Sequence, residues 1–100
     1  MKNYFKHSSI KPRGSEFIVC SELMSRVDDL APSDASVSAI IHRMADGMYH
    51  TMIPVRAITF ANAENGQLYA EATTRSLISS LKQAQAEVLK KLKEWKSNRF

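Results

Sequence analysis

Two glycine-containing dipeptides, Asp46-Gly47 and Asn65-Gly66, constrain the fold of this chain more than any other feature. Each can adopt the positive φ angles of a type I′ turn, which indicates a β-hairpin when strand-like segments flank it. Apolar and polar residues alternate along the flanking segments, residues 35–44, 48–60 and 67–72. Alternation with a period of two is typical of a strand with one buried face. The sequence therefore predicts a three-stranded antiparallel meander.

The middle segment of this meander contains Pro54. Proline has no N–H to donate to a neighbouring strand. Pro54 should therefore mark a bulge, or a place where the middle strand runs past its neighbour. Residues 3–10 can add one further strand to the sheet.

Helical periodicity predicts a helix on each side of the meander. From residue 77 to residue 95 the apolar positions recur at spacings of three and four, which is one helical face, and Thr73 or Thr74 can cap this helix. The segment from Ser15 to Leu30 carries a second apolar face, formed by Phe17, Cys20, Leu23, Met24, Val27 and Leu30. The predicted fold class is α+β in the order βαβββα. Its antiparallel sheet has four strands, or at least three, and both helices pack on one face.

The length and composition narrow the class of protein. A chain of 100 residues is predicted to be a single domain, 1–100. No apolar run approaches the roughly 20 residues that span a bilayer, so no membrane partner is expected. The N-terminal residues lack the apolar core of a secretory signal, and the only cysteine, Cys20, leaves no internal disulfide. These features predict a cytoplasmic protein.

Catalytic and metal-binding patterns are missing from the sequence. His42 and His50 can face each other across the first hairpin, but they lack the third ligand that a metal site needs. Cys20 lies on an apolar helical face, where a thiol acts as a small hydrophobe. No serine stands in a G-x-S-x-G context, and the isolated glycines form no phosphate-binding loop. We therefore expect no enzyme activity, metal, cofactor or small-molecule substrate.

The charged residues divide the chain into three parts. Residues 1–13 and residues 82–100 each carry a net charge of +4, whereas residues 14–81 carry −4. Basic ends around an acidic middle suggest directional binding to an anionic partner such as nucleic acid or a membrane surface. Two solubilising ends would explain the same distribution.

A helical wheel of the last helix separates its charges. Lys82, Lys93 and Lys96 form a row without an acid, and Lys90 lies beyond it. The glutamates, Glu87 and Glu94, occupy another side, where Glu94 can pair with Lys90. A solvated face would interleave the two signs, so this segregation favours contacts with phosphates.

Trp95 shares this helix end with the lysines but lies on the core side of the wheel. We therefore predict that it anchors the helix, rather than stacking on a base.

Taken together, these segments resemble the short form of the ribosome hibernation-promoting factors, the ribosome-associated translation inhibitors. The similarity rests on "FKH", "SEFIVCSELMSRVDDL", "ASVSAIIHR" and "LYAEATTRSLISSLKQAQAEVLKKLKEWK". It implies a βαβββα domain that binds the small ribosomal subunit in the channel of messenger and transfer RNAs, and blocks translation without catalysis. Two departures are the acid-rich first helix and the strand around Pro54.

The resemblance also implies which side chains hold ribosomal RNA. By position, this role passes to basic residues of the last helix: Lys82, Lys90, Lys91, Lys93, Lys96 and Arg99. Basic residues elsewhere complete the predicted set: Arg75, Lys6, Lys11 and Arg13. The oligomeric state and any ribosome dimerisation stay open.

Two other functions remain as alternatives. A double-stranded RNA-binding domain shares the αβββα order, but that family has its lysines at the start of the last helix, where this chain has only Arg75. A protein-interaction module would use a free sheet edge to pair with a partner strand. RNA binding should weaken steeply with salt, whereas pairing with a protein strand should not.

Overall fold

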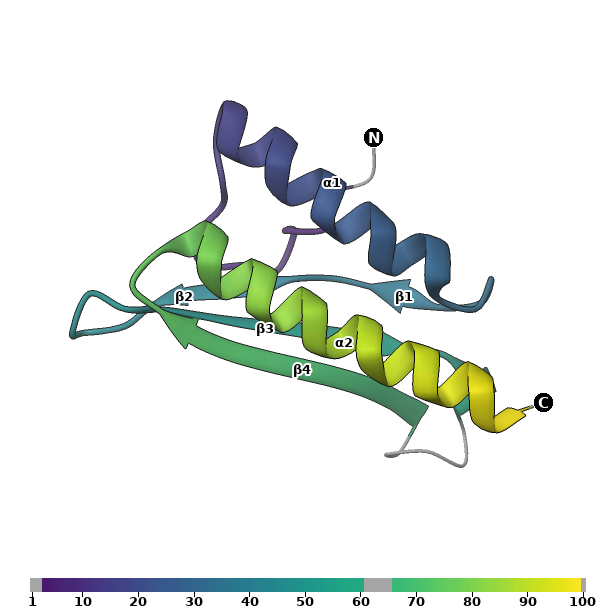
Figure 1. The fold of residues 1–100 in the computed structure, drawn as a ribbon. Coiled ribbons are helices and arrows are strands. Elements are labelled where there is room, and N and C mark those ends of the chain that lie inside the picture. Colours follow the sequence, from purple (N-terminus) through teal and green to yellow (C-terminus); the bar gives the residue numbers. More distant parts are fainter. Residues whose placement is uncertain (1–2, 61–65, 100) are drawn as a thin grey trace.

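The computed structural model describes residues 3–60 and 66–99, with the side chains of residues 98 and 99 excepted. Two helices cover one face of an antiparallel sheet, and the other face is open (Figure 1). The elements in chain order are α1 (Ser15–Leu30), β1 (Ser36–Val37), β2 (Ile40–Arg43), β3 (Tyr49–Arg56), a 3-10 turn η1 (Ile58–Phe60), β4 (Gln67–Thr74) and α2 (Leu77–Arg99). The predicted α+β class, with four antiparallel strands and two helices, is confirmed.

The central strand is β3, which pairs with β4 along its whole length on one side and with β1 and β2 in turn on the other. Ser36 pairs with Arg56 and Ile40 with Met52, so β1 and β2 keep one continuous register against β3. The break between them faces Pro54, which accepts a bond from Ser38 N–H at 3.4 Å and has no N–H to return. Pro54 therefore divides the neighbouring strand, and the structure contains no bulge there.

The N-terminal segment lies beside β2, but it is not the strand predicted over residues 3–10. Residues 4–7 form turns, and the surrounding chain bonds the outer edge of the sheet at separate points. Ala39 N–H donates to Tyr4 O at 2.8 Å, Ile41 N–H to Ser8 Oγ at 2.8 Å, and Ile10 N–H to Ile41 O at 3.2 Å. The turn lets both Tyr4 and Phe5 enter the core, which a regular strand with alternating side chains would prevent.

The two turn dipeptides behave differently. Gly47 has φ +85° and closes the β2–β3 hairpin, but its N–H bonds Met44 O at 2.9 Å. The central residues are therefore Ala45 and Asp46, so the predicted type I′ turn at Asp46-Gly47 is wrong and a three-residue loop takes its place. The second dipeptide is not the whole loop of a two-residue hairpin, because β3 ends at Arg56 and β4 begins at Gln67, with η1 between them. Its residue 65 lies outside the described residues.

The helices follow their predicted faces closely. Helix α1 has the predicted bounds, Ser15–Leu30, and buries Cys20, Met24 and Val27. Helix α2 begins at Leu77, and its cap is Ser76, whose Oγ accepts a bond from Ser79 N–H at 3.1 Å. The predicted caps, Thr73 and Thr74, are the last residues of β4.

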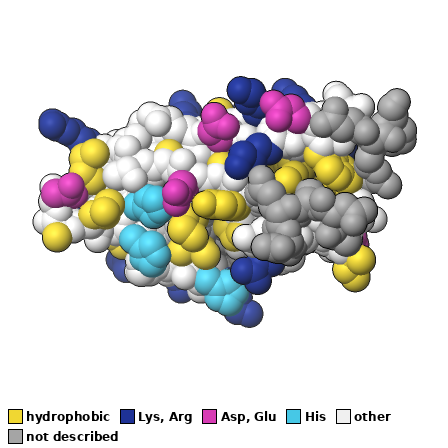
Figure 2. Space-filling view, turned by 90° about the horizontal axis from the view of Figure 1, so that it is seen from below, with side chains coloured by type: hydrophobic (Ala, Val, Ile, Leu, Met, Phe, Trp, Pro, Cys, Tyr) yellow, Lys and Arg dark blue, Asp and Glu magenta, His cyan; other side chains and the backbone are white. Residues whose placement is uncertain are grey.

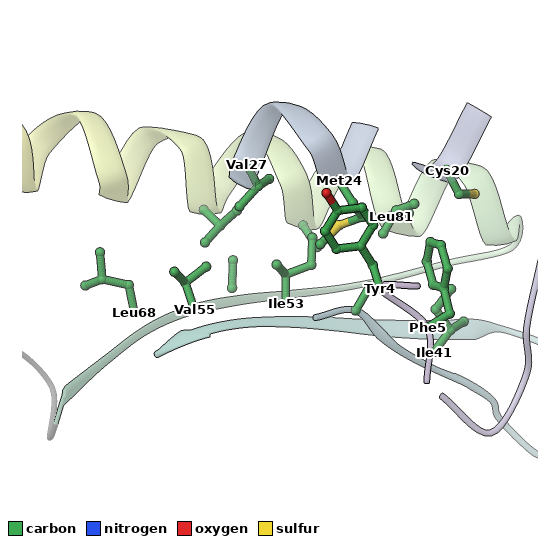
Figure 3. Close-up of a cluster of buried hydrophobic side chains, with 14 of the residues drawn as sticks. Tyr4, Phe5, Cys20, Met24, Val27, Ile41, Ile53, Val55, Leu68 and Leu81 are labelled. Carbon is green, nitrogen blue, oxygen red and sulfur yellow. The ribbon is translucent and has the colours of Figure 1, made fainter. Parts of the chain in front are cut away.

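The core lies between the sheet and the two helices (Figure 3). Its buried side chains come from the N-terminal segment, from β2, β3 and β4, from η1 and from both helices. One buried polar contact joins the layers: the hydroxyl oxygens of Thr51 on β3 and Ser80 on α2 lie 2.7 Å apart. The fully buried stripe of Leu81, Val88 and Leu92 fixes which face α2 turns to solvent.

Trp95 continues this stripe near the end of α2. It is partly buried and meets Phe60 of η1 in a T-shaped contact, with ring centroids 4.9 Å apart. The predicted packing of Trp95 against the core is confirmed. Because Phe60 is itself 1% exposed, the contact anchors the last turns of α2 on the core.

Candidate nucleic-acid interface

The outward side of α2 carries three exposed lysines, Lys82, Lys90 and Lys93. We call this set the lysine face. The buried stripe holds α2 over β3 and β4, and Gln85 bonds the backbone of α1 through Leu23 O at 3.1 Å. With the sheet below it and α1 beside it, α2 directs these three lysines away from the body of the molecule.

The charges on α2 are less segregated than the helical wheel predicted. Lys90, Lys93 and Glu94 line one shallow hollow on the helix. A second hollow, toward β4, joins Lys90 to Glu87 and Glu71. Among the described residues no ion pair joins Lys90 to Glu94, so the predicted pair is not formed. Lys82, five residues before Glu87, is therefore the cation of this face most distant from an acid along the helix.

Lys91 lies apart from the lysine face. Its ammonium donates to Tyr69 O at 2.7 Å and lies 5.4 Å from the centre of the Tyr69 ring. It thus covers part of the edge of β4 that no described strand pairs with. This contact gives Lys91 a structural use, because a lysine on an open edge hinders pairing with another chain. Arg99, also predicted to bind RNA, has its side chain outside the described residues.

Lys96 is partly exposed and lies around the helix from Lys93, where it borders an open hollow with Trp95. Asp34 and Thr59 also line this hollow. Thr59 donates twice to the Asp34 carboxylate, from its hydroxyl at 2.8 Å and from its N–H at 3.2 Å. The Thr59 hydroxyl bond, with smaller help from nearby backbone N–H groups, lowers the pKa of Asp34. Asp34 is therefore a fixed, ionised acceptor at neutral pH.

The remaining predicted cations gather at the opposite end of α2. Arg75 is exposed in the turn before α2, and Lys11 and Arg13 are exposed just before α1. Both helices begin at the same end of the molecule (Figure 1). Lys6 is exposed in the N-terminal turn. Helix α2 is about 35 Å long, and Lys93 and Lys96 lie near its C-terminal end. The structure thus places these four residues far from Lys93 and Lys96.

The open face of the sheet has a different character. Figure 2 shows hydrophobic and histidine side chains on this face. His42 and His50 lie opposite each other as predicted, and His50 contacts Glu71 at 3.2 Å and Thr73 at 2.8 Å. Within the described ranges, no group of three or more His, Cys, Asp or Glu side chains could hold a metal ion.

Two further observations concern the reactivity of Cys20 and the possibility of a membrane-spanning helix. Burial, with a smaller effect of Glu16, raises the pKa of the Cys20 thiol to about 11, so the thiol is neutral at physiological pH. In the part of the chain that the structure describes, no helix is long and apolar enough to cross a membrane.

The fold can now be compared with known proteins. No protein-family description matches the sequence, and no curated protein is significantly similar to it. Among solved structures, the N-terminal domain of Protein Y from Thermus thermophilus superposes with a TM-score of 0.65 at 10% identity, covering 86% of this chain and 88% of that one. A ribosomal subunit interface protein from Coxiella burnetii also gives 0.65, at 11% identity, covering 90% and 91%.

This chain shares their fold. At 10% and 11% identity the similarity concerns the fold, and this fold has the α+β class that the sequence predicted. The Asp34–Thr59 contact was missed by the sequence reasoning, because it joins residues 25 positions apart in two irregular segments. No periodicity signals such a contact.

Proposed function

We propose that this protein is a non-catalytic factor that binds the small ribosomal subunit and blocks translation by occupying its RNA channel. The observation that carries the proposal is the lysine face on a fold shared with a ribosomal subunit interface protein. The N-terminal domain of Protein Y shares this fold. The whole chain, 1–100, acts as one unit in the cytoplasm.

The lysine face supplies the grip on RNA. Lys82 and Lys93 are separated by eleven residues, or about 16 Å along the helix axis. Ammonium groups at this spacing can neutralise separate phosphates of one RNA backbone, which releases counterions and makes binding depend on salt.

The basic residues at the other end of α2 extend the proposed contact. Lys11, Arg13 and Arg75, with Lys6, are exposed where both helices begin. They would meet a second stretch of ribosomal RNA. We include Lys91 and Arg99 as secondary contacts only, since Lys91 already bonds Tyr69 O.

A pair of matched variants tests the proposal. Lys82→Glu/Lys93→Glu and Arg43→Glu/Arg56→Glu change the net charge equally, but the second pair lies on β2 and β3. Purified small subunits should pellet the wild type and the Arg43/Arg56 variant at low salt, and the Lys82/Lys93 variant should bind at least tenfold more weakly. The same order is expected for inhibition of cell-free translation. Equal binding by both variants would show that the lysine face is not the contact.

The protein-interaction alternative rests on the open edge of β4. Lys91 covers that edge at Tyr69, so a partner strand would first have to displace this contact. Such a partner would bind with little dependence on salt, and Lys91→Ala would strengthen it. Neither result is expected for a factor that binds RNA phosphates.

A further inference from the structure

Strand β4 forms one long edge of the sheet, and no described strand pairs with its outer side (Figure 1). Pro54 O accepts a bond from Ser38 N–H on the β1–β2 side of β3, so Tyr69, opposite Pro54, makes no ladder bond with it. Lys91 reaches Tyr69 O from outside the sheet, which agrees with this alternation. Every second residue of β4 therefore turns its backbone N–H and C=O outward: Gln67, Tyr69, Glu71 and Thr73. Such an edge can pair with one more strand.

Helix α2 presents one acid and one base beside this edge. Glu87 and Lys91 lie about 6 Å apart along the helix axis, and both line a hollow of about 510 Å³ that borders residues 69–71. Because α2 runs back over β4 in the opposite direction, Lys91 lies beside Tyr69 and Glu87 beside Glu71. Among the described residues, no ion pair engages Glu87. The edge is thus cationic at one point and acidic two strand residues further on.

A twofold axis through Ala70 makes these two points complementary. An antiparallel pair of β4 strands centred there joins Tyr69 of one copy to Glu71 of the other through their outward backbone groups. Lys91 of each copy then lies opposite Glu87 of the other copy. A register centred on Glu71 would instead set two glutamates directly opposite each other, which is unfavourable. The charges therefore favour the register centred on Ala70.

The second copy also supplies a partner for the lysine that it displaces. Lys91 has to leave Tyr69 O when another strand bonds this edge. An unrelated strand leaves the ammonium without that bond, whereas a second copy brings Glu87 to it. Neighbouring strands lie about 4.8 Å apart and α2 lies over β3 and β4, so the two α2 helices come to roughly 10 Å, the distance of packed helices. The Lys91 and Glu87 side chains can meet across this distance.

We propose that the protein forms a homodimer by antiparallel pairing of its β4 edges, with Glu87–Lys91 ion pairs between the two copies. The contact is isologous, because the same surface of each copy meets itself, and it joins the two sheets into one. This inference goes beyond the proposed function. The twofold axis runs perpendicular to the sheet, so both helix layers lie on the same side of the dimer. The lysine faces of both copies stay exposed on that side.

Sedimentation equilibrium of the purified chain without RNA tests the strand pairing. The wild type should show a dimer mass that falls to the monomer mass on dilution, and sooner at high salt. Glu71→Pro removes an outward N–H that β3 does not use, so this variant should fold and stay monomeric. Glu71→Ala loses the same side chain but keeps the N–H, so it should still dimerise. A wild type that is monomeric up to about 1 mM, or a Glu71→Pro variant that dimerises as Glu71→Ala does, would overturn the proposal.

Charge reversal tests the ion pairs without changing the backbone. Glu87→Lys and Lys91→Glu alone each set like charges opposite each other, so each should weaken the dimer about tenfold. The double variant Glu87→Lys/Lys91→Glu restores both pairs and should regain the wild-type dissociation constant within about threefold. A double variant as weak as the single variants would contradict this register. Small-subunit pelleting of Glu71→Pro reports on the proposed function separately, because Lys82 and Lys93 are unchanged in it.

Discussion

The buried hydroxyl pair between Thr51 and Ser80 gives a quantitative test of how α2 is held on the sheet. Both residues are 0% exposed. Ser80 Oγ donates to Leu77 O at 2.9 Å, which uses its only proton, so the 2.7 Å contact with Thr51 is a bond donated by Thr51. The two hydroxyls are therefore not equivalent, and their substitutions should differ.

Replacing the acceptor should cost more than replacing the donor. Ser80→Ala leaves the buried Thr51 hydroxyl without its partner, which should lower the free energy of unfolding by about 1–3 kcal/mol. Thr51→Val leaves Ser80 bonded to Leu77 O and should cost about 0.5–1 kcal/mol. In the double variant no buried hydroxyl donor lacks an acceptor, so this variant should be about 1 kcal/mol more stable than Ser80→Ala alone.

Urea denaturation of the four proteins measures these differences, and thermal unfolding should follow at about 4–8 °C per kcal/mol. Ser25→Ala is the matched control, because Ser25 Oγ bonds a carbonyl three residues back in α1, Glu22 O, at 2.8 Å near the surface. It should change stability by less than about 0.5 kcal/mol. If the two single losses simply add in the double variant, the hydroxyl pair does not couple β3 to α2 as described.

Three further predictions concern single residues. Gly47→Ala should lower the free energy of unfolding by about 1 kcal/mol in urea titrations, because the residue has φ +85°, which an L-amino acid with a side chain rarely adopts. A steric clash adds nothing to this cost, since an added Cβ would meet nothing within 4 Å. Gly47→Asn should lower the free energy of unfolding by less than Gly47→Ala, and equal losses would contradict the turn geometry. Cys20 should react with a thiol reagent at least roughly 100-fold more slowly than a free cysteine at pH 8, because its pKa is raised to about 11 and it is buried; fast labelling of the native protein would contradict this burial. Burial and the bond to Asp28 raise the pKa of Tyr4 from 10.0 to about 12. The folded state thus retains this proton longer, and the contribution of Tyr4 to stability is complete below pH 10 and declines as pH rises through 12. Unfolding measured across this range should show a smaller decline for Tyr4→Phe, and an equal decline would exclude this role.

Local patterns predicted the helices and their faces well. Helix α1 begins and ends at the predicted residues, and the predicted α2 stripe is buried through Leu92. The helix bounds and buried faces depend on residue spacing within one segment, so they can be predicted from the sequence. The alternation around β3 likewise predicted that its side chains divide between two faces, and Thr51, Ile53 and Val55 of one face are all fully buried.

Features that depend on distant segments were predicted less well. Pro54 signalled a disturbance in the sheet, but its effect falls on the neighbouring strand at Ser38, a partner that the sequence does not name. The N-terminal turn replaces a strand because Tyr4 and Phe5 both find room in the core. At the candidate interface, the wheel placed Lys82 and Lys93 correctly on the open side of α2. It could not show that Lys91 bonds Tyr69 O or that Asp34 and Trp95 line one hollow.

The salt dependence of binding to purified small ribosomal subunits tests the central claim most directly. Each phosphate contact that is lost should reduce the slope of log affinity against log salt by roughly 0.7–1. We predict a steep negative slope for the wild type, the same slope for Arg43→Glu/Arg56→Glu, and a slope shallower by about 2 for Lys82→Glu/Lys93→Glu. A wild-type affinity that does not change with salt, or one slope for all three proteins, would contradict RNA binding through the lysine face.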